Sequence, residues 1–145
     1  MIPGVTCERC HGPGAAHSAR PTLNNIVRLS KLSATESVRF CAECHRSAAA
    51  EPQDPVSIRF QPLGLMASKC YQVSGALSCV TCHAPHDDLV HDSGFYIARC
   101  LGCHASNGGR PAVSCKRAAR QDCLPCHMKR ASPLPFLTFT DHRIH

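Results

Sequence analysis

The chain has no tryptophan and few other aromatic residues, which together make up 5% of its 145 residues. Large aromatic side chains supply much of an ordinary core, and eleven prolines and nine glycines further interrupt regular structure. No apolar run is long enough to cross a bilayer, and the first residues lack the basic and apolar segments of a secretion leader. These shortages exclude a membrane-spanning helix and argue against a chain that folds around its own side chains alone.

Cysteine, by contrast, is abundant: ten of the twelve cysteines lie in five copies of Cys-x-x-Cys-His, the attachment motif of c-type haem. Cysteines three residues apart are one helical turn from each other, so both thiols can reach the vinyl groups of one porphyrin edge. The next histidine can then bind the iron. We therefore expect five covalent haems, each bound by a cysteine pair and a histidine: Cys7, Cys10 and His11; Cys41, Cys44 and His45; Cys79, Cys82 and His83; Cys100, Cys103 and His104; Cys123, Cys126 and His127.

A single Cys-x-x-Cys is more often half of a zinc site or a redox dithiol. The segment from Cys7 to Gly14 even matches the Cys-x-x-Cys-x-Gly-x-Gly knuckle of chaperone zinc domains. The other four copies lack those glycines, and all five have the histidine. The repetition therefore favours haem over zinc.

The formal charge of +6 would ordinarily suggest nucleic acid or a membrane surface as a partner. Each ferric haem with two histidine ligands carries a net charge of about −1 because of its propionates, so five haems would cancel most of the excess. We expect no nucleic-acid partner. Covalent haem attachment takes place outside the cytoplasm, which predicts a periplasmic or extracellular protein. Because Met1 lies six residues before Cys7, we expect a fragment without its leader and some upstream sequence.

The five motifs are spread along the whole chain, so we expect residues 1–145 to form one pentahaem domain, mostly irregular, with short α-helices and negligible strand. Residues 33–36, Ser-Ala-Thr-Glu, predict a capping box for a helix ending at His45. Asp92 or Ser93 can cap a helix to His104, and Pro62 can open a short one reaching Cys70. Proline- and glycine-rich residues 51–55, 106–111 and 131–135 predict loops, and residues 134–140 an extended segment. In the fifth motif, Pro125 could perturb the helical turn.

Three segments resemble multihaem cytochromes c: Gly4 to Gly14 followed by His17, Ser78 to His86, and Cys126-His127-Met128 followed by residues 140–144. This family includes the tetrahaem electron acceptor of hydroxylamine oxidoreductase and larger proteins in which such a haem domain is joined to tetratricopeptide repeats. The likeness follows the motif order over nearly the whole chain. It departs at Lys129, where relatives usually have proline.

The resemblance implies that His17, His86 and His142 are distal iron ligands. His17 and His86 each follow a motif closely, so each is expected to bind the iron of a neighbouring haem and not of its own. His91 and His145 are weaker candidates. Cys70 and Cys115 lie outside the motifs and, in an oxidising compartment, predict a disulfide, with two buried free thiols as the alternative.

Three functions are compatible with a chain of five haems. Iron bound by two histidines is saturated and suits transfer of single electrons between redox partner proteins. An iron with an open position would instead allow an enzyme to convert nitrite, hydroxylamine or a similar small nitrogen compound. A third possibility is the haem module of a larger repeat protein or of a self-associating cytochrome filament. No motif ends in lysine, a mark of nitrite-reducing haems, so electron transfer is the favoured prediction and an enzyme the alternative.

Overall fold

The computed structural model describes residues 4–45, 55–104 and 123–145. Most of the elements are short helices: α1 (Cys7–His11), α2 (Ala15–Ala19), α3 (Ala34–His45), α4 (Gln61–Ala67), α5 (Lys69–Ser74), α6 (Cys79–Cys82), α7 (Ser93–His104) and α8 (Leu124–His127), with 3₁₀ turns η1 (Leu29–Lys31) and η2 (Pro55–Arg59). Strands β1 (Arg130–Leu134) and β2 (Leu137–Thr140) form one antiparallel hairpin. The prediction of short helices with little strand is confirmed for the described residues.

The longest helices begin where the sequence predicts. Ser33 and Glu36 form the capping box of α3: the Ser33 N–H donates to the Glu36 carboxylate at 2.8 Å and the Glu36 N–H to the Ser33 hydroxyl at 3.3 Å. The Ser33 hydroxyl also donates to the Glu36 carboxylate at 2.6 Å, and this bond, followed by that from the Ser33 N–H, lowers the pKa of Glu36. At α7 the cap is Asp92, whose carboxylate accepts from the N–H groups of Gly94 and Phe95 at 3.0 and 3.2 Å.

The predicted helix from Pro62 to Cys70 is divided in two at Ser68. Its hydroxyl donates to the Leu65 carbonyl at 2.7 Å, ending α4, and accepts from the Tyr71 N–H at 3.2 Å, opening α5. Ser68 competes with the helical backbone for its hydrogen bonds, which is why a single helix does not continue through it.

The hairpin corrects the loop predicted for residues 131–135. Arg130 pairs with Thr140 and Leu134 with Leu137, with an irregular register between Ala131 and Leu134. Pro133 lies in that irregular stretch; proline is tolerated there because both strands of a lone hairpin are edge strands. The other two predicted loops fall mainly (51–54) or wholly (106–111) outside the described residues.

The core is small and lies between α3, α4 and η2. Val38 of α3 and Leu65 of α4 are the buried hydrophobic side chains of the described residues. Several large apolar side chains are exposed, namely Val5, Leu23, Val27, Val73, Val80, Leu89, Phe136 and Leu137. Packing within the polypeptide therefore buries little of its apolar surface.

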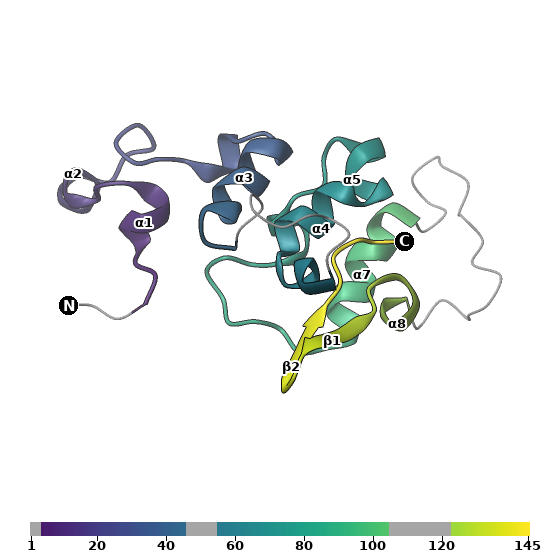
Figure 1. Cartoon of the computed structure of the whole chain (residues 1–145). Coiled ribbons are helices and arrows are strands. Elements are labelled where there is room, and N and C mark those ends of the chain that lie inside the picture. The colour runs from purple at the N-terminus through teal and green to yellow at the C-terminus, as the bar shows by residue number, and fades with distance from the viewer. Residues whose placement is uncertain (1–3, 46–54, 105–122) are drawn as a thin grey trace.

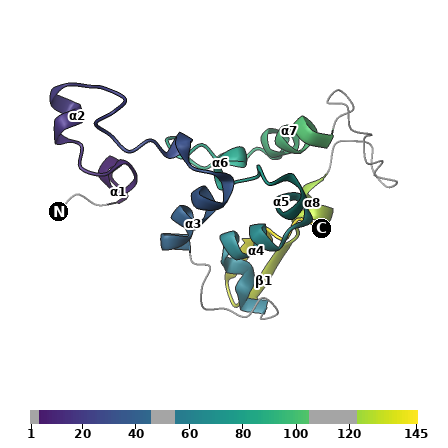
Figure 2. The same ribbon diagram turned by 90° about the horizontal axis from the view of Figure 1, so that it is seen from above.

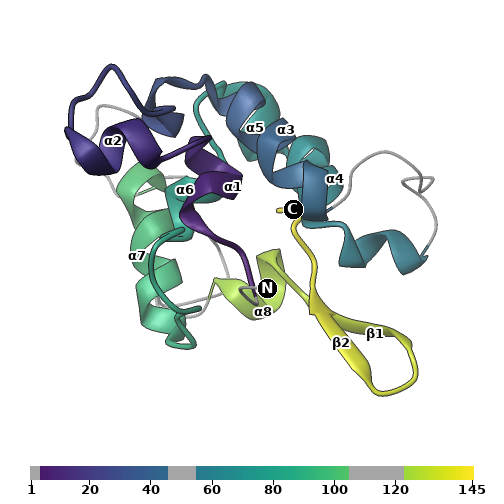
Figure 3. The same cartoon turned by 90° about the vertical axis from the view of Figure 1, so that its left-hand side faces the viewer.

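The elements form an elongated arrangement with α1 and α2 at one end and the hairpin, α7 and α8 towards the other (Figure 1). The view from above agrees: α1 and α2 stand apart, joined to α3 by an extended segment (Figure 2). Seen end-on, the C-terminal segment leaves the hairpin and runs up beside α4 (Figure 3). None of the helices in the described ranges has the length and apolarity to span a membrane.

Candidate haem-binding site

All five Cys-x-x-Cys-His motifs lie on or beside helices. The first motif is α1 itself, and the second and fourth form the last turns of α3 and α7. The third spans α6, with His83 directly after it, and the fifth spans α8, with Cys123 directly before it. Pro125 lies in the first turn of α8, where its missing N–H leaves no helical bond unmade, so it does not break the turn. The paired cysteines consequently lie on one face of a helical turn, the arrangement that attachment to one porphyrin edge requires.

The second and third motifs meet at their thiols. Burial, together with the neighbouring Cys41 thiol and a hydrogen bond with it, raises the pKa of Cys79 to about 12. Helices α3 and α6, which carry these cysteines, pack against each other. The two attachment points are therefore adjacent in space.

Thiols of the third, fourth and fifth motifs are also neighbours. The pKa of Cys82 is raised, mainly by burial. The guanidinium of Arg99 acts in the opposite direction, and the nearby Cys103 thiol raises the pKa further. Burial, and then the thiols of Cys123, Cys82 and Cys70, raise the pKa of Cys100. Motif cysteines distant in sequence thus form a continuous series of neighbours.

His86 lies beside His11, the histidine of the first motif. The two ring centroids are 5.9 Å apart and the ring planes differ by 16°. A metal–imidazole bond of about 2.0–2.1 Å, plus about 1.1 Å from nitrogen to ring centre, would separate the centroids of two axial histidines by roughly 6.2 Å. The separation of His11 and His86 fits one metal ion bound between them.

His142, near the end of the chain, lies beside His83 of the third motif. Their ring centroids are 6.3 Å apart and the planes differ by 32°; both angles are acceptable because each imidazole can rotate about its bond to a metal. Burial lowers the pKa of His142, and burial followed by the charge of His45 lowers that of His83. Both rings are thereby held in the neutral form that binds metals.

The backbone orients several of these imidazoles. Nδ1 of His11 donates to the Val27 carbonyl at 2.8 Å, and Nδ1 of His142 donates to the Thr140 carbonyl at 2.9 Å. A carbonyl oxygen only accepts, so the proton is on Nδ1 and the lone pair on Nε2. Metal-binding histidines usually make this hydrogen bond. Main-chain acceptors leave no signal in the sequence, so these hydrogen bonds could not be predicted from it.

His17 and His127 are held similarly. Nδ1 of His17 donates to the Thr22 carbonyl at 3.1 Å and to the Asn25 side-chain oxygen at 2.9 Å. Nδ1 of His127 donates to the main-chain oxygen of His145. Each Nε2 is therefore available to a metal, although no second histidine ring contacts that of His17 or His127 in the described part of the chain.

The remaining candidates are less constrained. His45, His104 and His91 are exposed, and His145 is exposed with its ring 3.9 Å from Asp141. No disulfide joins two cysteines of the described ranges. Cys115 lies outside the described residues, so the predicted Cys70–Cys115 disulfide stays a prediction.

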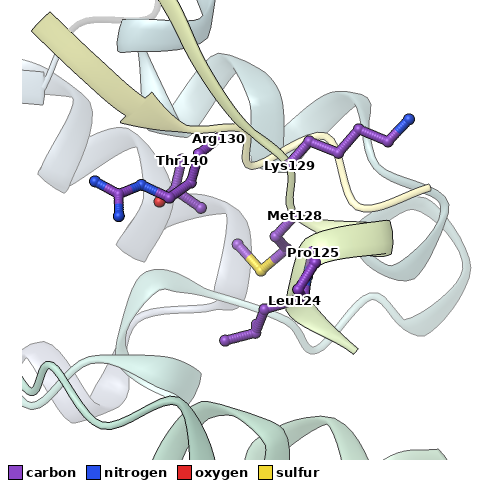
Figure 4. A pocket seen from close by; sticks show the side chains of 6 residues that line it. All are labelled: Leu124, Pro125, Met128, Lys129, Arg130 and Thr140. Carbon is purple, nitrogen blue, oxygen red and sulfur yellow. The ribbon is translucent and has the colours of Figure 1, made fainter. Parts of the chain in front are cut away.

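A cavity of about 490 Å³ lies beside the fifth motif, lined by Leu124, Pro125, Met128, Lys129, Arg130 and Thr140 (Figure 4). The Met128 side chain extends towards Leu124, whereas Lys129 points away from the other lining residues (Figure 4). At 3.6 residues per turn, positions 124, 125 and 128 lie opposite Cys123, Cys126 and His127. This cavity is therefore behind the fifth attachment point.

The donor set suits haem, because the porphyrin supplies four of the iron's ligands and the protein adds one on each face. Histidine pairs meet that need. Groups of three or more histidine, cysteine or acidic side chains arranged for a metal ion are not found among residues 4–45, 55–104 and 123–145. Comparison of the chain with family models, with curated proteins and with solved structures gave no match.

Proposed function

We propose that the chain is a multihaem c-type cytochrome that transfers single electrons between redox partner proteins. The carrying observation is that two motif histidines, His11 and His83, each face a histidine from outside the motifs at a separation fitting two axial ligands of one iron. A protein that used the motifs only as dithiols would have no need for these pairs. In this proposal His86 and His142 are distal ligands, and His86 binds the iron of a motif other than the one it follows.

The five cysteine pairs would hold the haems through thioether bonds, and the five motif histidines would bind the irons from one side. Bound haem supplies a one-electron couple between ferric and ferrous iron. Two histidine ligands saturate that iron, so the first and third haems have no position for a substrate. This ligand set favours electron transfer over catalysis at those two haems.

The neighbouring thiols of the second to fifth motifs support a continuous route for electrons. Haems attached at adjacent points lie close together, which a wire requires. The small side-chain core and the exposed apolar residues also agree with a polypeptide that packs mainly against its cofactors. Covalent attachment of haem puts the protein in the periplasm or outside the cell. The proposal agrees with the resemblance to multihaem cytochromes c.

Intact mass under denaturing conditions tests the cofactor. Protein made with a haem-attachment system should exceed the 15.7 kDa polypeptide by about 3 kDa, which is five haems, because thioether bonds survive denaturation. Electron paramagnetic resonance of the oxidised protein then tests the function: the first and third haems should be low-spin. A chain that takes up zinc without gaining covalent mass would refute the proposal. A full-intensity high-spin signal shifted by nitrite would favour the enzyme.

A further inference from the structure

The segment that carries His142 is fixed at several points after β2. The Asp141 N–H donates to the Lys129 carbonyl at 2.8 Å, which ties the segment to the residues after α8. The Arg143 N–H donates to the Asp141 carboxylate at 2.9 Å, and the Arg143 guanidinium donates to the hydroxyl of Ser57 in η2. Residues 141–143 therefore have little freedom to move away from the body of the protein.

The segment crosses α4 at Gly64, which is buried. A Cβ atom at position 64 would lie 3.1 Å from the carbonyl carbon of His142, 3.2 Å from its Cβ and 3.2 Å from the Arg143 nitrogen. Ordinary contacts of a Cβ atom are about 3.4–4 Å, and main-chain atoms cannot rotate out of the way as a side-chain end can. Glycine is also less favourable than alanine inside a helix, so Gly64 makes α4 itself less stable than alanine would.

We infer that Gly64 is the positioning residue for the distal histidine of the third haem. Its missing side chain lets the C-terminal segment lie close enough to α4 for the His142 ring to face His83. The chemical meaning of that position rests on the proposed function, since it assumes that an iron lies between the two rings. Gly64 itself touches no ligand; it acts only through the backbone of residues 142 and 143.

Gly64→Ala is the direct test. The added methyl should push the segment outward by a few tenths of an ångström, which a short iron–nitrogen bond does not tolerate. We expect about one fifth of the total iron, one haem of five, to become high-spin in the oxidised protein, and the same haem to respond in His142→Ala. Added imidazole should restore the low-spin signal in both variants. Gly14→Ala is the matched control, because its Cβ would make only an ordinary contact, 3.5 Å from a Glu8 carboxylate oxygen, and it should leave all haems unchanged.

A chain ending at Asp141 separates positioning from the packing of α4. Without residues 142–145 the three closest contacts of the methyl are gone, so Gly64→Ala should change neither haem content nor spin state relative to the shortened chain with Gly64. An effect of equal size in the full and shortened chains would overturn the inference, even if the full-length variant folds poorly. A full-length Gly64→Ala protein whose spin states match those of the wild type would also overturn it while leaving the proposed function intact. A wild-type chain without covalent haem would instead refute the proposed function.

Discussion

His86→Ala should release the N-terminal arm, residues 7–28, from the rest of the molecule. The arm holds itself together: the Val27 N–H donates to the His11 carbonyl at 3.0 Å, and the Asn25 amide donates to the Ala16 carbonyl at 3.1 Å. In the described residues, the ring contact and the ion pair that join it to the body are the His11–His86 pair and Arg9–Glu43 at 3.2 Å. If both histidines bind one iron, the His11–His86 pair is a stronger attachment than the ion pair.

The ion pair alone is a weak attachment. The Arg9 and Glu43 side chains are 57% and 54% exposed, and an ion pair of that kind stabilises by about 0.2–1 kcal/mol. That free energy alone favours the docked arm about 1.4- to 5-fold, and because the conformational entropy of the chain favours the free arm, at least roughly a sixth to two fifths of the molecules should have a free arm. The wild-type protein, with the ligand bond in place, should have almost none.

Small-angle X-ray scattering and electron paramagnetic resonance should change together in His86→Ala. We expect a larger radius of gyration and one new high-spin haem, and a further expansion when Glu43→Ala is added. His91→Ala is the control, because His91 is an exposed histidine of the same loop. A variant with the spin states and scattering of the wild type would show that His86 neither binds the first haem nor holds the arm.

Two further predictions concern the tail and α3. His142→Ala should turn one haem high-spin and raise its reduction potential, measured by redox titration, by roughly 60 mV or more, the one-electron equivalent of a tenfold weaker preference for the ferric state. His145→Ala is the control: it keeps the main-chain oxygen that accepts from His127, so its potentials should equal those of the wild type. Ser33→Ala should raise the pKa of Glu36 towards its ordinary value, measured by NMR titration of the reduced protein, and an unchanged pKa would contradict the capping geometry. Because the pKa of Glu36 is lower in the folded state, the cap stabilises α3 at pH values above the unfolded-state pKa. That stabilisation is lost as the pH falls through the folded-state pKa.

Local patterns carried most of what the sequence predicted. The capping box at Ser33 and the cap at Asp92 depend on neighbours within three residues, so spacing alone located both helix starts. The helical turns of the motifs were predictable for the same reason. The division at Ser68 was not predicted, because serine also occurs within helices and only its two hydrogen bonds show that it ends one helix and opens another.

Long-range arrangements were less accessible. The sequence singled out His86 and His142 through a resemblance, but which motif histidine each would face depends on how distant segments come together. Gly64 had no signal at all, because its role arises from the backbone of a segment that crosses α4. The extended segment predicted for residues 134–140 contains β2, but β1 was missed because Pro133 and Pro135 indicate a loop, whereas a two-stranded ribbon accepts proline on its open edges.

The two histidine pairs close loops that overlap. One loop runs from His11 to His86 and contains the second and third motifs; the other runs from His83 to His142 and contains the fourth and fifth. In a chain that emerges from its N-terminus, the first haem would be attached before His86 follows, and the third before His142 follows. During maturation each of these irons would therefore pass through a state with one open face, which closes only when its own distal histidine arrives. Closing either loop costs conformational entropy, but the segment from His83 to His86 belongs to both, so closing one orders part of the other.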